Sequence, residues 1–202
     1  MPEKNNPSRV LRSRATEFKT RAEGEALTIS GYMVVFDQPY YIDDTQEEII
    51  DRGAFDGAEK EDVRALVDHL SHLVLGRTTA GTLEFSIDDY GVFATIRINE
   101  KDQDAMNLYA RVQRGDVNQA SFGFDEDFEA GECITLPDGR VRWAVRRITK
   151  LWEFSVCTFP AYEQTLVESR SRQLDAWLEN HRQAELASRK AALRRKFKHP
   201  RS

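Results

Sequence analysis

Three residues of this chain carry the side chains that a hydrolytic nucleophile and its activating partners need: Ser121, His69 and Glu153. Ser121 lies in the heptapeptide Asn-Gln-Ala-Ser-Phe-Gly-Phe (118–124), where one hydroxyl stands among apolar neighbours in what reads as a buried strand. A serine hydroxyl becomes a useful nucleophile when a base accepts its proton, and histidine is the side chain whose ordinary pKa lies nearest physiological pH. The first question is therefore which histidine could serve Ser121.

The chain has four histidines, of which His181 and His199 lie in a charged C-terminal stretch where no pocket is expected. His69 is the better candidate for a general base than His72, because it closes an apolar run and would be aimed from the end of a strand. The alternative is a histidine in a surface turn. His69 and His72 could also bind a metal, with Asp68, but H-E-x-x-H is absent and spacing indicates no third ligand. We therefore predict neither a metal nor a cofactor.

Glu153 stands inside the apolar stretch Leu-Trp-Glu-Phe-Ser-Val (151–156). A buried acid is costly without a partner, and an imidazole N–H would be such a partner while fixing the tautomer of the base. Alternatively, Glu153 points outward from an edge strand, or pairs with Arg146 or Arg147 across a hairpin. Apolar residues lie on both sides of it, so simple alternation does not decide which way it faces.

Composition indicates a soluble globular protein with one main domain. The 202 residues suffice for one good-sized core, with 31% charged and 40% hydrophobic residues. No apolar run is long enough to span a membrane, and the N-terminus lacks the apolar core of a secretory signal, so we expect a cytoplasmic protein. Cys133 and Cys157 are too few for a disulfide framework and have no C-x-x-C spacing, which favours free thiols in a reducing compartment.

The net charge of −5 is unevenly distributed along the chain. Residues 1–25 carry +2 and residues 165–202 carry +6, which leaves −13 for the middle. The negative charge of the middle part argues against a protein that binds specific nucleic-acid sequences, although the basic C-terminal stretch could contact acidic protein surfaces. We divide the chain into a polar, mobile N-terminal arm (1–25), a folded domain (26–164) and a basic C-terminal helical extension (165–202).

The folded domain reads as strand-rich. β-branched and aromatic runs bounded by turn residues predict about seven strands. An interior helix is indicated by apolar residues at helical spacing from Ala105 to Val112, ending at Gly115, and Asp-Asp-Tyr-Gly (88–91) predicts a hairpin turn in which Gly91 is available for a positive φ. We predict an α+β fold, with a barrel or a strongly curved, mainly antiparallel sheet. The seven expected strands are 27–36, 63–69, 82–87, 92–98, 119–128, 141–149 and 151–159, and residues 47–50 could add one short strand.

Five motifs, in order and spanning about residues 27–165, resemble the prohead maturation proteases of tailed bacteriophages. They are Gly-Tyr-Met-Val-Val-Phe (31–36), Gly-Ala-Phe (53–55), Val-Asp-His (67–69) followed by Leu-Gly-Arg (75–77), Ala-Ser-Phe-Gly-Phe (120–124), and Trp-Glu-Phe-Ser-Val-Cys-Thr-Phe-Pro-Ala (152–161). The resemblance implies a serine endopeptidase whose fold is related to the herpesvirus assemblins, a β-barrel surrounded by helices. It also implies that His69 is the general base and Ser121 the nucleophile. The phage enzymes use an acid as third member, for which we assign Glu153.

The resemblance further implies a substrate and a place of action. The enzyme would cleave scaffold protein, or the scaffold-like segment of the major capsid protein, inside the prohead in the host cytoplasm, and would also cleave itself. Self-association is possible under this hypothesis, and backbone N–H groups near Gly123, or Arg146 or Arg147, would stabilise the oxyanion. The alternatives are a non-enzymatic assembly or scaffolding factor, and a metal-dependent hydrolase that uses His69 and His72. The C-terminal extension matches no family motif.

Overall fold

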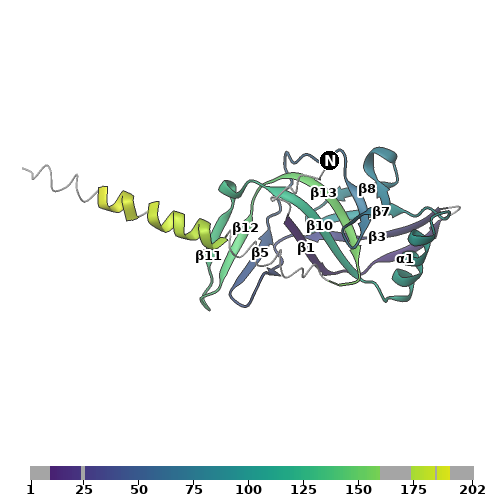
Figure 1. Cartoon of the computed structure of the whole chain (residues 1–202), viewed down its shortest axis with the longest axis horizontal. Helices are drawn as coiled ribbons and strands as arrows, with labels where there is room; N and C mark the ends of the chain where they lie inside the picture. Colours follow the sequence, from purple (N-terminus) through teal and green to yellow (C-terminus); the bar gives the residue numbers. More distant parts are fainter. Residues whose placement is uncertain (1–9, 24–25, 160–173, 185, 192–202) are drawn as a thin grey trace, which may run out of the picture. The chain divides into compact units, whose positions relative to one another are not determined.

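The computed structural model describes residues 10–23, 26–159, 174–184 and 186–191. By its contacts the chain divides into two compact units, Met1–Tyr162 and Glu163–Ser202, and each is described by itself. Figure 1 shows that the first unit contains the strands and the labelled helix α1. The candidate site residues Ser121, His69 and Glu153 all belong to this unit.

The described strands of the first unit form three sheets. The five-stranded sheet has the order β1 (Val10–Ala15), β10 (Gln119–Glu126), β13 (Ile148–Cys157), β6 (Arg64–Val67) and β7 (Leu70–Arg77). One four-stranded sheet has the order β11 (Glu132–Thr135), β12 (Val141–Val145), β5 (Gln46–Ile50) and β4 (Tyr40–Tyr41). The other has the order β2 (Lys19–Glu23), β3 (Ala26–Val35), β9 (Gly91–Arg97) and β8 (Leu83–Ile87).

The α+β class and the richness in strands are confirmed, whereas a barrel is not, because none of these sheets closes on itself. Pairing is mainly antiparallel, with parallel pairs between β13 and β6 and between β12 and β5. Two short 3-10 helices, η1 (Thr78–Ala80) and η2 (Phe128–Ala130), join the strands. The parallel β6–β13 pair matters for the site, since it brings the end of β6 beside β13.

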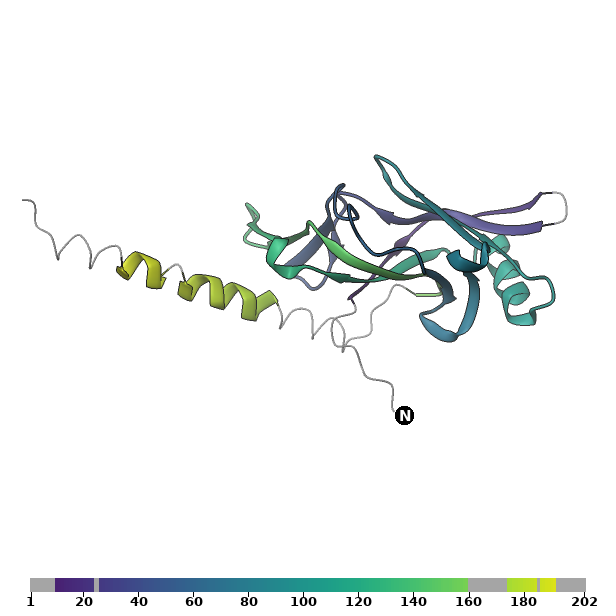
Figure 2. The ribbon, with the colours of Figure 1, turned by 90° about the horizontal axis from the view of Figure 1, so that it is seen from above.

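The helix predicted from apolar spacing is α1 (Gln103–Arg114). The Asp102 side chain caps its first turn, and Gly115, at φ 87°, ends it in the left-handed region that glycine tolerates. The predicted apolar face is buried, and α1 contacts β2 and β7. Figures 1 and 2 both show α1 beside the long β2–β3 pair. The buried residues of the helix are Ala105, Leu108, Tyr109 and Val112.

The structure of the described part of residues 1–25 differs from the predicted mobile arm. The sequence predicts a mobile arm, but residues 10–15 and 19–23 are β1 and β2, each paired antiparallel with a neighbouring strand, while residues 1–9 and 24–25 lie outside the described part. Short polar segments give no alternating apolar signal, so their pairing depends on an available sheet edge. β4, β7 and β11 are likewise absent from the predicted set, and the domain boundaries themselves stay predictions.

The predicted hairpin between β8 and β9 is present, but Gly91 is needed there for a different reason. Asp88 N donates to Gly91 O at 3.0 Å, and the φ of Gly91 is not positive. A Cβ at this position would lie 2.0 Å from the carbonyl oxygen of Val34. Gly91 is therefore required by the close approach of β3, to which β9 is paired.

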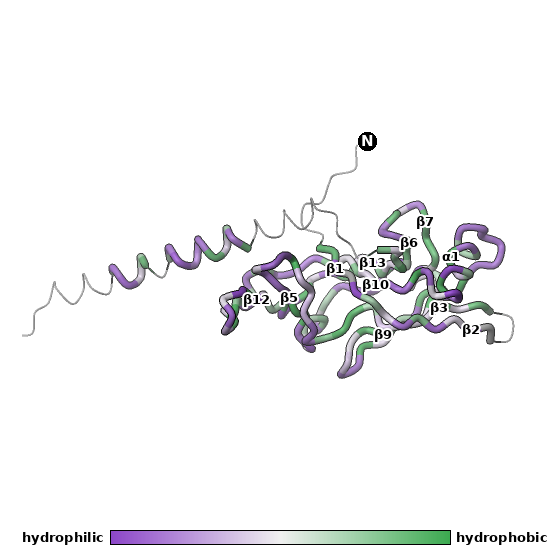
Figure 3. Tube along the Cα trace, turned by 90° about the horizontal axis from the view of Figure 1, so that it is seen from below, coloured by the Kyte–Doolittle hydropathy of each residue, from purple (hydrophilic) through white to green (hydrophobic). Residues whose placement is uncertain are grey.

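The second unit is helical where it is described, over residues 174–184 and 186–191. The sequence predicts one long helix over 165–202, and the rest of that range lies outside the described part. Figure 3 shows this helix as mainly hydrophilic. The Trp177 and His181 rings stack with centroids 3.7 Å apart. Among the described residues no helix has the length and apolar character needed to cross a membrane.

Candidate active site

His69 is presented by a tight turn at the end of β6. Asp68 and His69 both have positive φ, at 45° and 61°, a region that non-glycine residues rarely adopt. The Asp68 carboxylate holds the turn against the end of β13, because Oδ1 accepts from Thr158 N at 2.8 Å and Oδ2 accepts from Thr158 Oγ1 at 3.3 Å. A strained conformation fixed by its surroundings often marks a functional position. The turn places the imidazole beyond the strand end, as the sequence predicts.

Glu153 is the acid that meets this imidazole. Its Oε1 lies 2.6 Å from His69 Nδ1; Glu153 is on β13, and His69 lies in the turn that follows β6, the strand parallel to β13. The Glu153 side chain is 1% exposed and that of His69 is 17% exposed. A buried carboxylate beside Nδ1 favours the proton on that nitrogen and leaves Nε2 to act as a base. Of the alternatives left open by the sequence, the structure therefore shows the inward-facing acid bound to imidazole.

Arg146 and Arg147 have other partners. Arg146 pairs with Asp51 at 3.3 Å and also with Glu132, and Arg147 pairs with Asp127 at 3.6 Å. All of these side chains are partly or largely exposed. Neither arginine is the partner of the buried acid, and their acidic neighbours make them poor candidates for stabilising an oxyanion.

Ser155 belongs to the same cluster, and sequence reasoning missed it. Its hydroxyl donates to Glu153 Oε2 at 2.6 Å and accepts from the backbone N–H of His69 at 3.1 Å. Ser155 thus connects the acid to the strained turn and holds both in place. The alternation of a strand could have identified Ser155 from the sequence. Alternate residues of a strand share a face, so Glu153, Ser155 and Cys157 lie on one face of β13.

Ser121 lies on β10, the strand beside β13. It is directly opposite Ser155 in the antiparallel register, so both side chains project from the same face of the sheet. Ser121 is fully buried, and its Oγ donates to the carbonyl oxygen of Arg12 at 2.8 Å. The contacts of these described residues include no hydrogen bond between Ser121 and His69. The structure thus joins His69 and Glu153 directly and places Ser121 on the adjoining strand, and its role as nucleophile stays a prediction.

Cys157 approaches the other imidazole nitrogen. Its Sγ lies 3.9 Å from His69 Nε2, and the residue is buried. Burial raises the pKa of the Cys157 thiol strongly, and the negative charges of Asp68 and Glu153 raise it further. The thiolate is the reactive form of cysteine, so this thiol is neutral and inert at ordinary pH.

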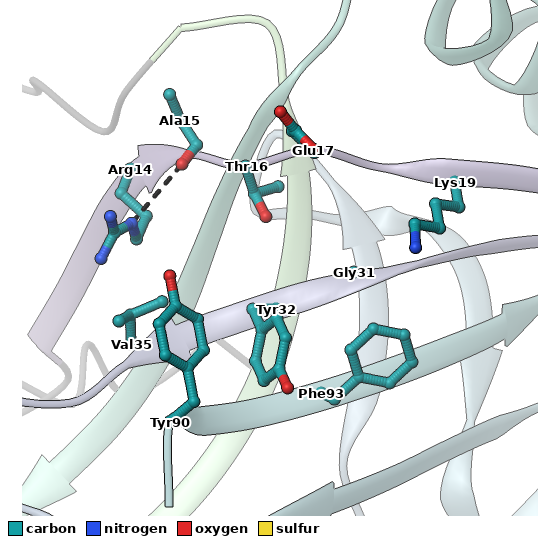
Figure 4. A pocket seen from close by; sticks show the side chains of 10 residues that line it. All are labelled: Arg14, Ala15, Thr16, Glu17, Lys19, Gly31, Tyr32, Val35, Tyr90 and Phe93. Carbon is teal, nitrogen blue, oxygen red and sulfur yellow. Dashed lines mark hydrogen bonds between the residues drawn. The ribbon is translucent and has the colours of Figure 1, made fainter.

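The described residues outside this cluster offer no better site. His72 lies on β7 and is exposed, and among the described residues no group of three His, Cys, Asp or Glu side chains could hold a metal ion. A cavity of about 480 Å³, drawn in Figure 4, is lined by Tyr32, Tyr90, Phe93 and neighbouring residues from β1 to β3. None of its lining residues is Ser121, His69 or Glu153, so this cavity is separate from the cluster.

Comparisons with known proteins place the chain in a family. The model of the family described as Caudovirus prohead serine protease matches residues 14–180. The prohead protease of Enterobacteria phage HK97 is 29% identical over 149 residues, which are 74% of this chain and 62% of that relative. The chain therefore spans less than two thirds of the relative's length. A solved structure of the bacteriophage T4 capsid assembly protease covers 73% of this chain and 97% of its own, with 8% identity and a TM-score of 0.45.

Proposed function

We propose, since the chain belongs to the caudovirus prohead serine protease family, that it is a serine endopeptidase of capsid maturation. The resemblance predicted from the five sequence motifs is thereby confirmed at the level of the family. The proposed substrate is scaffold protein, or a scaffold-like segment of the major capsid protein, inside the prohead in the host cytoplasm. Cleavage of the chain itself and self-association belong to the same proposal.

One observation carries the assignment: the buried Glu153 carboxylate lies 2.6 Å from His69 Nδ1. This is the contact that the acid of a catalytic triad makes with its histidine, and it holds the imidazole in the tautomer that can accept a proton at Nε2. The position of Ser121, opposite Ser155 on the neighbouring strand, puts a hydroxyl on the same sheet face as the acid.

In the proposed mechanism Ser121 Oγ attacks the carbonyl carbon of the scissile peptide while His69 Nε2 accepts its proton. Collapse of the tetrahedral intermediate breaks the C–N bond, and His69 returns the proton to the leaving amine. Water, deprotonated by His69, then hydrolyses the ester on Ser121. The Ser121 hydroxyl must turn from the Arg12 carbonyl oxygen toward His69 for the first step. Backbone N–H groups near Gly123 are the proposed oxyanion donors.

A cysteine nucleophile is a second candidate, because Cys157 Sγ is 3.9 Å from His69 Nε2. The strongly raised pKa of its thiol counts against it, since a catalytic cysteine needs an environment that lowers its pKa. A non-enzymatic assembly factor is a further alternative from the sequence. That alternative predicts no cleavage of capsid or scaffold protein at all.

The test is coexpression with the capsid and scaffold proteins of the same phage, followed by intact-mass measurement of their products. We expect shortened capsid or scaffold subunits with the wild-type chain and none with Ser121→Ala. Ser86→Ala is the matched control, because Ser86 is an exposed strand serine, and it should leave processing intact. Unchanged processing by Ser121→Ala would remove Ser121 from the mechanism, and loss with Cys157→Ala alone would favour the cysteine candidate.

A further inference from the structure

Strand β1 lies along the edge of β10 as an extended peptide substrate would. Its only partner in the described sheet is β10, and β10 carries Ser121. The pairing is antiparallel, with Ser13 opposite Ser121 and Arg12 opposite Phe122. Addition of a strand to a sheet edge is a common way to bind extended peptides, with backbone hydrogen bonds supplying affinity and side-chain pockets supplying specificity. Figure 1 shows β1 beside β10.

The register places one particular peptide bond at the proposed nucleophile. Ser121 Oγ donates to the carbonyl oxygen of Arg12 at 2.8 Å. The carbonyl group nearest to the hydroxyl is therefore that of the Arg12–Ser13 bond. A substrate strand in the same register would present the carbonyl of its corresponding residue to Ser121, and that residue would precede the scissile bond.

The side chain of Arg12 enters a buried acidic site on the opposite face of the strand. Its Nε lies 2.6 Å from Glu48 Oε1 and its second terminal nitrogen, Nη2, lies 2.8 Å from Oε2. The Glu48 side chain is 0% exposed and the Arg12 side chain is 12% exposed. Tyr40 is the cross-strand neighbour of Glu48, and its ring meets that of Phe122 edge to face. Glu48, Tyr40 and Phe122 therefore form a site that suits a long basic side chain with an apolar stem.

β1 is held by its backbone ladder to β10, by contacts with β4 and by few buried side chains. Val10 is its one buried apolar residue among those whose side chains are described, while Leu11 is half-buried and Ala15 is exposed. The backbone ladder to β10 and the Arg12–Glu48 pair are the main contacts. A substrate strand with a basic residue in the position of Arg12 would reproduce both.

We propose that the β10 edge held by β1 is the substrate-binding edge, and that Glu48 selects Arg or Lys immediately before the scissile bond. β1 then acts as a substrate-like strand that an incoming peptide displaces. Withdrawal of the guanidinium from a buried carboxylate is costly, so peptides with an acidic or apolar residue in this position bind poorly. This inference rests on the proposed function, because it places the scissile bond at Ser121.

Binding is measured with the full chain carrying Ser121→Ala, which prevents turnover, and Arg12→Ala, which weakens its own β1. The probes are two fluorescein-labelled peptides with the sequence of residues 8–17, one unchanged and one with Glu in place of the arginine at position 12. Fluorescence anisotropy should show the unchanged peptide binding about tenfold tighter or more, as expected for a desolvated charge pair. Equal affinity, or no binding of either peptide, would overturn the inference.

Substitution of Glu48 in this background identifies the selecting group. With Glu48→Arg added the preference should reverse toward the glutamate peptide, and with Glu48→Gln it should nearly disappear. Glu84→Arg makes the same charge change at an exposed strand position and should leave the preference intact. The paired exchange Arg12→Glu with Glu48→Arg keeps the ion pair and serves as the folding control. A preference that survives both Glu48 substitutions would rule out Glu48 as the selecting residue.

A cleavage assay separates this inference from the proposed function. The wild-type chain and Ser121→Ala are incubated with a mixture of denatured proteins, and the new termini are identified by mass spectrometry. Cleavage that depends on Ser121 and follows Arg or Lys supports both proposals. Cleavage that depends on Ser121 but shows no preference for Arg or Lys overturns only the role of Glu48. If the protein binds peptides with charge selectivity but cleaves none, the proposed protease activity is contradicted, and the substrate-like binding edge is retained.

Discussion

Glu153 and Glu47 are both buried acids on strands, each 1% exposed, but they have different partners. Glu153 binds the imidazole of His69 through Nδ1. Glu47 instead binds two guanidinium groups, with 2.5 Å contacts to Arg140 and Arg142. The two sites lie in different sheets, on β13 and on β5. Burial alone therefore does not identify a functional acid in this protein.

The chemistry of the partner separates the two sites. Arginine keeps its charge at any ordinary pH, so the Glu47 cluster is a fixed ion pair that joins β5 to β12 and its preceding turn. An imidazole can accept a proton at one nitrogen while a carboxylate holds the other, so the pair of Glu153 and His69 has the groups needed for proton transfer. We therefore expect the first site to contribute mainly to stability, and we propose that the second takes part in catalysis. Substitutions at the two sites should therefore have different consequences.

The largest expected effect is that of Glu153→Gln on cleavage. The amide cannot hold the imidazole as the carboxylate does, and loss of the acid in comparable triads lowers kcat by about 10⁴-fold. The measurement is the rate of capsid or scaffold processing by purified variant and wild type. The thermal unfolding midpoint should change little by comparison. Processing at a near wild-type rate would show that Glu153 is a structural acid like Glu47.

Glu47→Gln should lower the stability of the fold and leave cleavage by the folded protein unchanged. Removing the Glu47 carboxylate takes this partner from Arg140 and Arg142, whose side chains are both 32% exposed, and costs about 3 kcal/mol of unfolding free energy, the lower end of the range for a buried pair. Urea titration followed by fluorescence measures this loss. Glu132→Gln is the matched control, because Glu132 pairs with Arg146 on a more exposed surface and should cost no more than about 1 kcal/mol. A selective loss of activity in well-folded Glu47→Gln would erase the distinction between the two sites.

Ser155→Ala should have an intermediate effect on both stability and activity. It removes the hydroxyl that bonds to Glu153 Oε2 and His69 N. Leaving a buried group without its hydrogen bond lowers the unfolding free energy by about 1–3 kcal/mol. We expect processing to slow by about 10- to 100-fold, since misplacement of a catalytic group is penalised at this level. Both quantities are measured on the same preparation, with Ser86→Ala as control. A loss of stability without any loss of activity would show that Ser155 has only a structural role.

Cys157→Ser should have the smallest effect. Burial and the nearby carboxylates raise the pKa of its thiol, so it stays protonated as pH rises through the neutral range and does not act as a nucleophile. Processing should stay within about twofold of wild type, because a neutral thiol contributes no attacking group. Folded protein treated with iodoacetamide at neutral pH should carry no label on Cys157. Rapid labelling, or loss of processing, would instead support the cysteine candidate.

The sequence by itself determined the principal strands, the α1 helix with its Gly115 end, and the pairing of His69 with Glu153 as one of several open possibilities. These follow from local chemistry: side-chain periodicity, capping residues and the high cost of an unpartnered buried acid. The family motifs, which are also local, indicated the protease class. The position of Ser121 within such a motif remains the reason to regard it as the nucleophile.

Only the tertiary structure decided which way Glu153 faces, because apolar residues flank it on both faces of β13 and its contact with His69 Nδ1 settles the matter. It also revealed that Arg12, within a segment too polar to show a strand pattern, lies in a strand bound to the edge of β10 and reaches Glu48, 36 residues away. Such contacts depend on which strands become neighbours, and the periodicity of side chains along a single segment does not predict this. The open sheets, in place of the expected barrel, are the same kind of result, since closure depends on how the sheet edges meet.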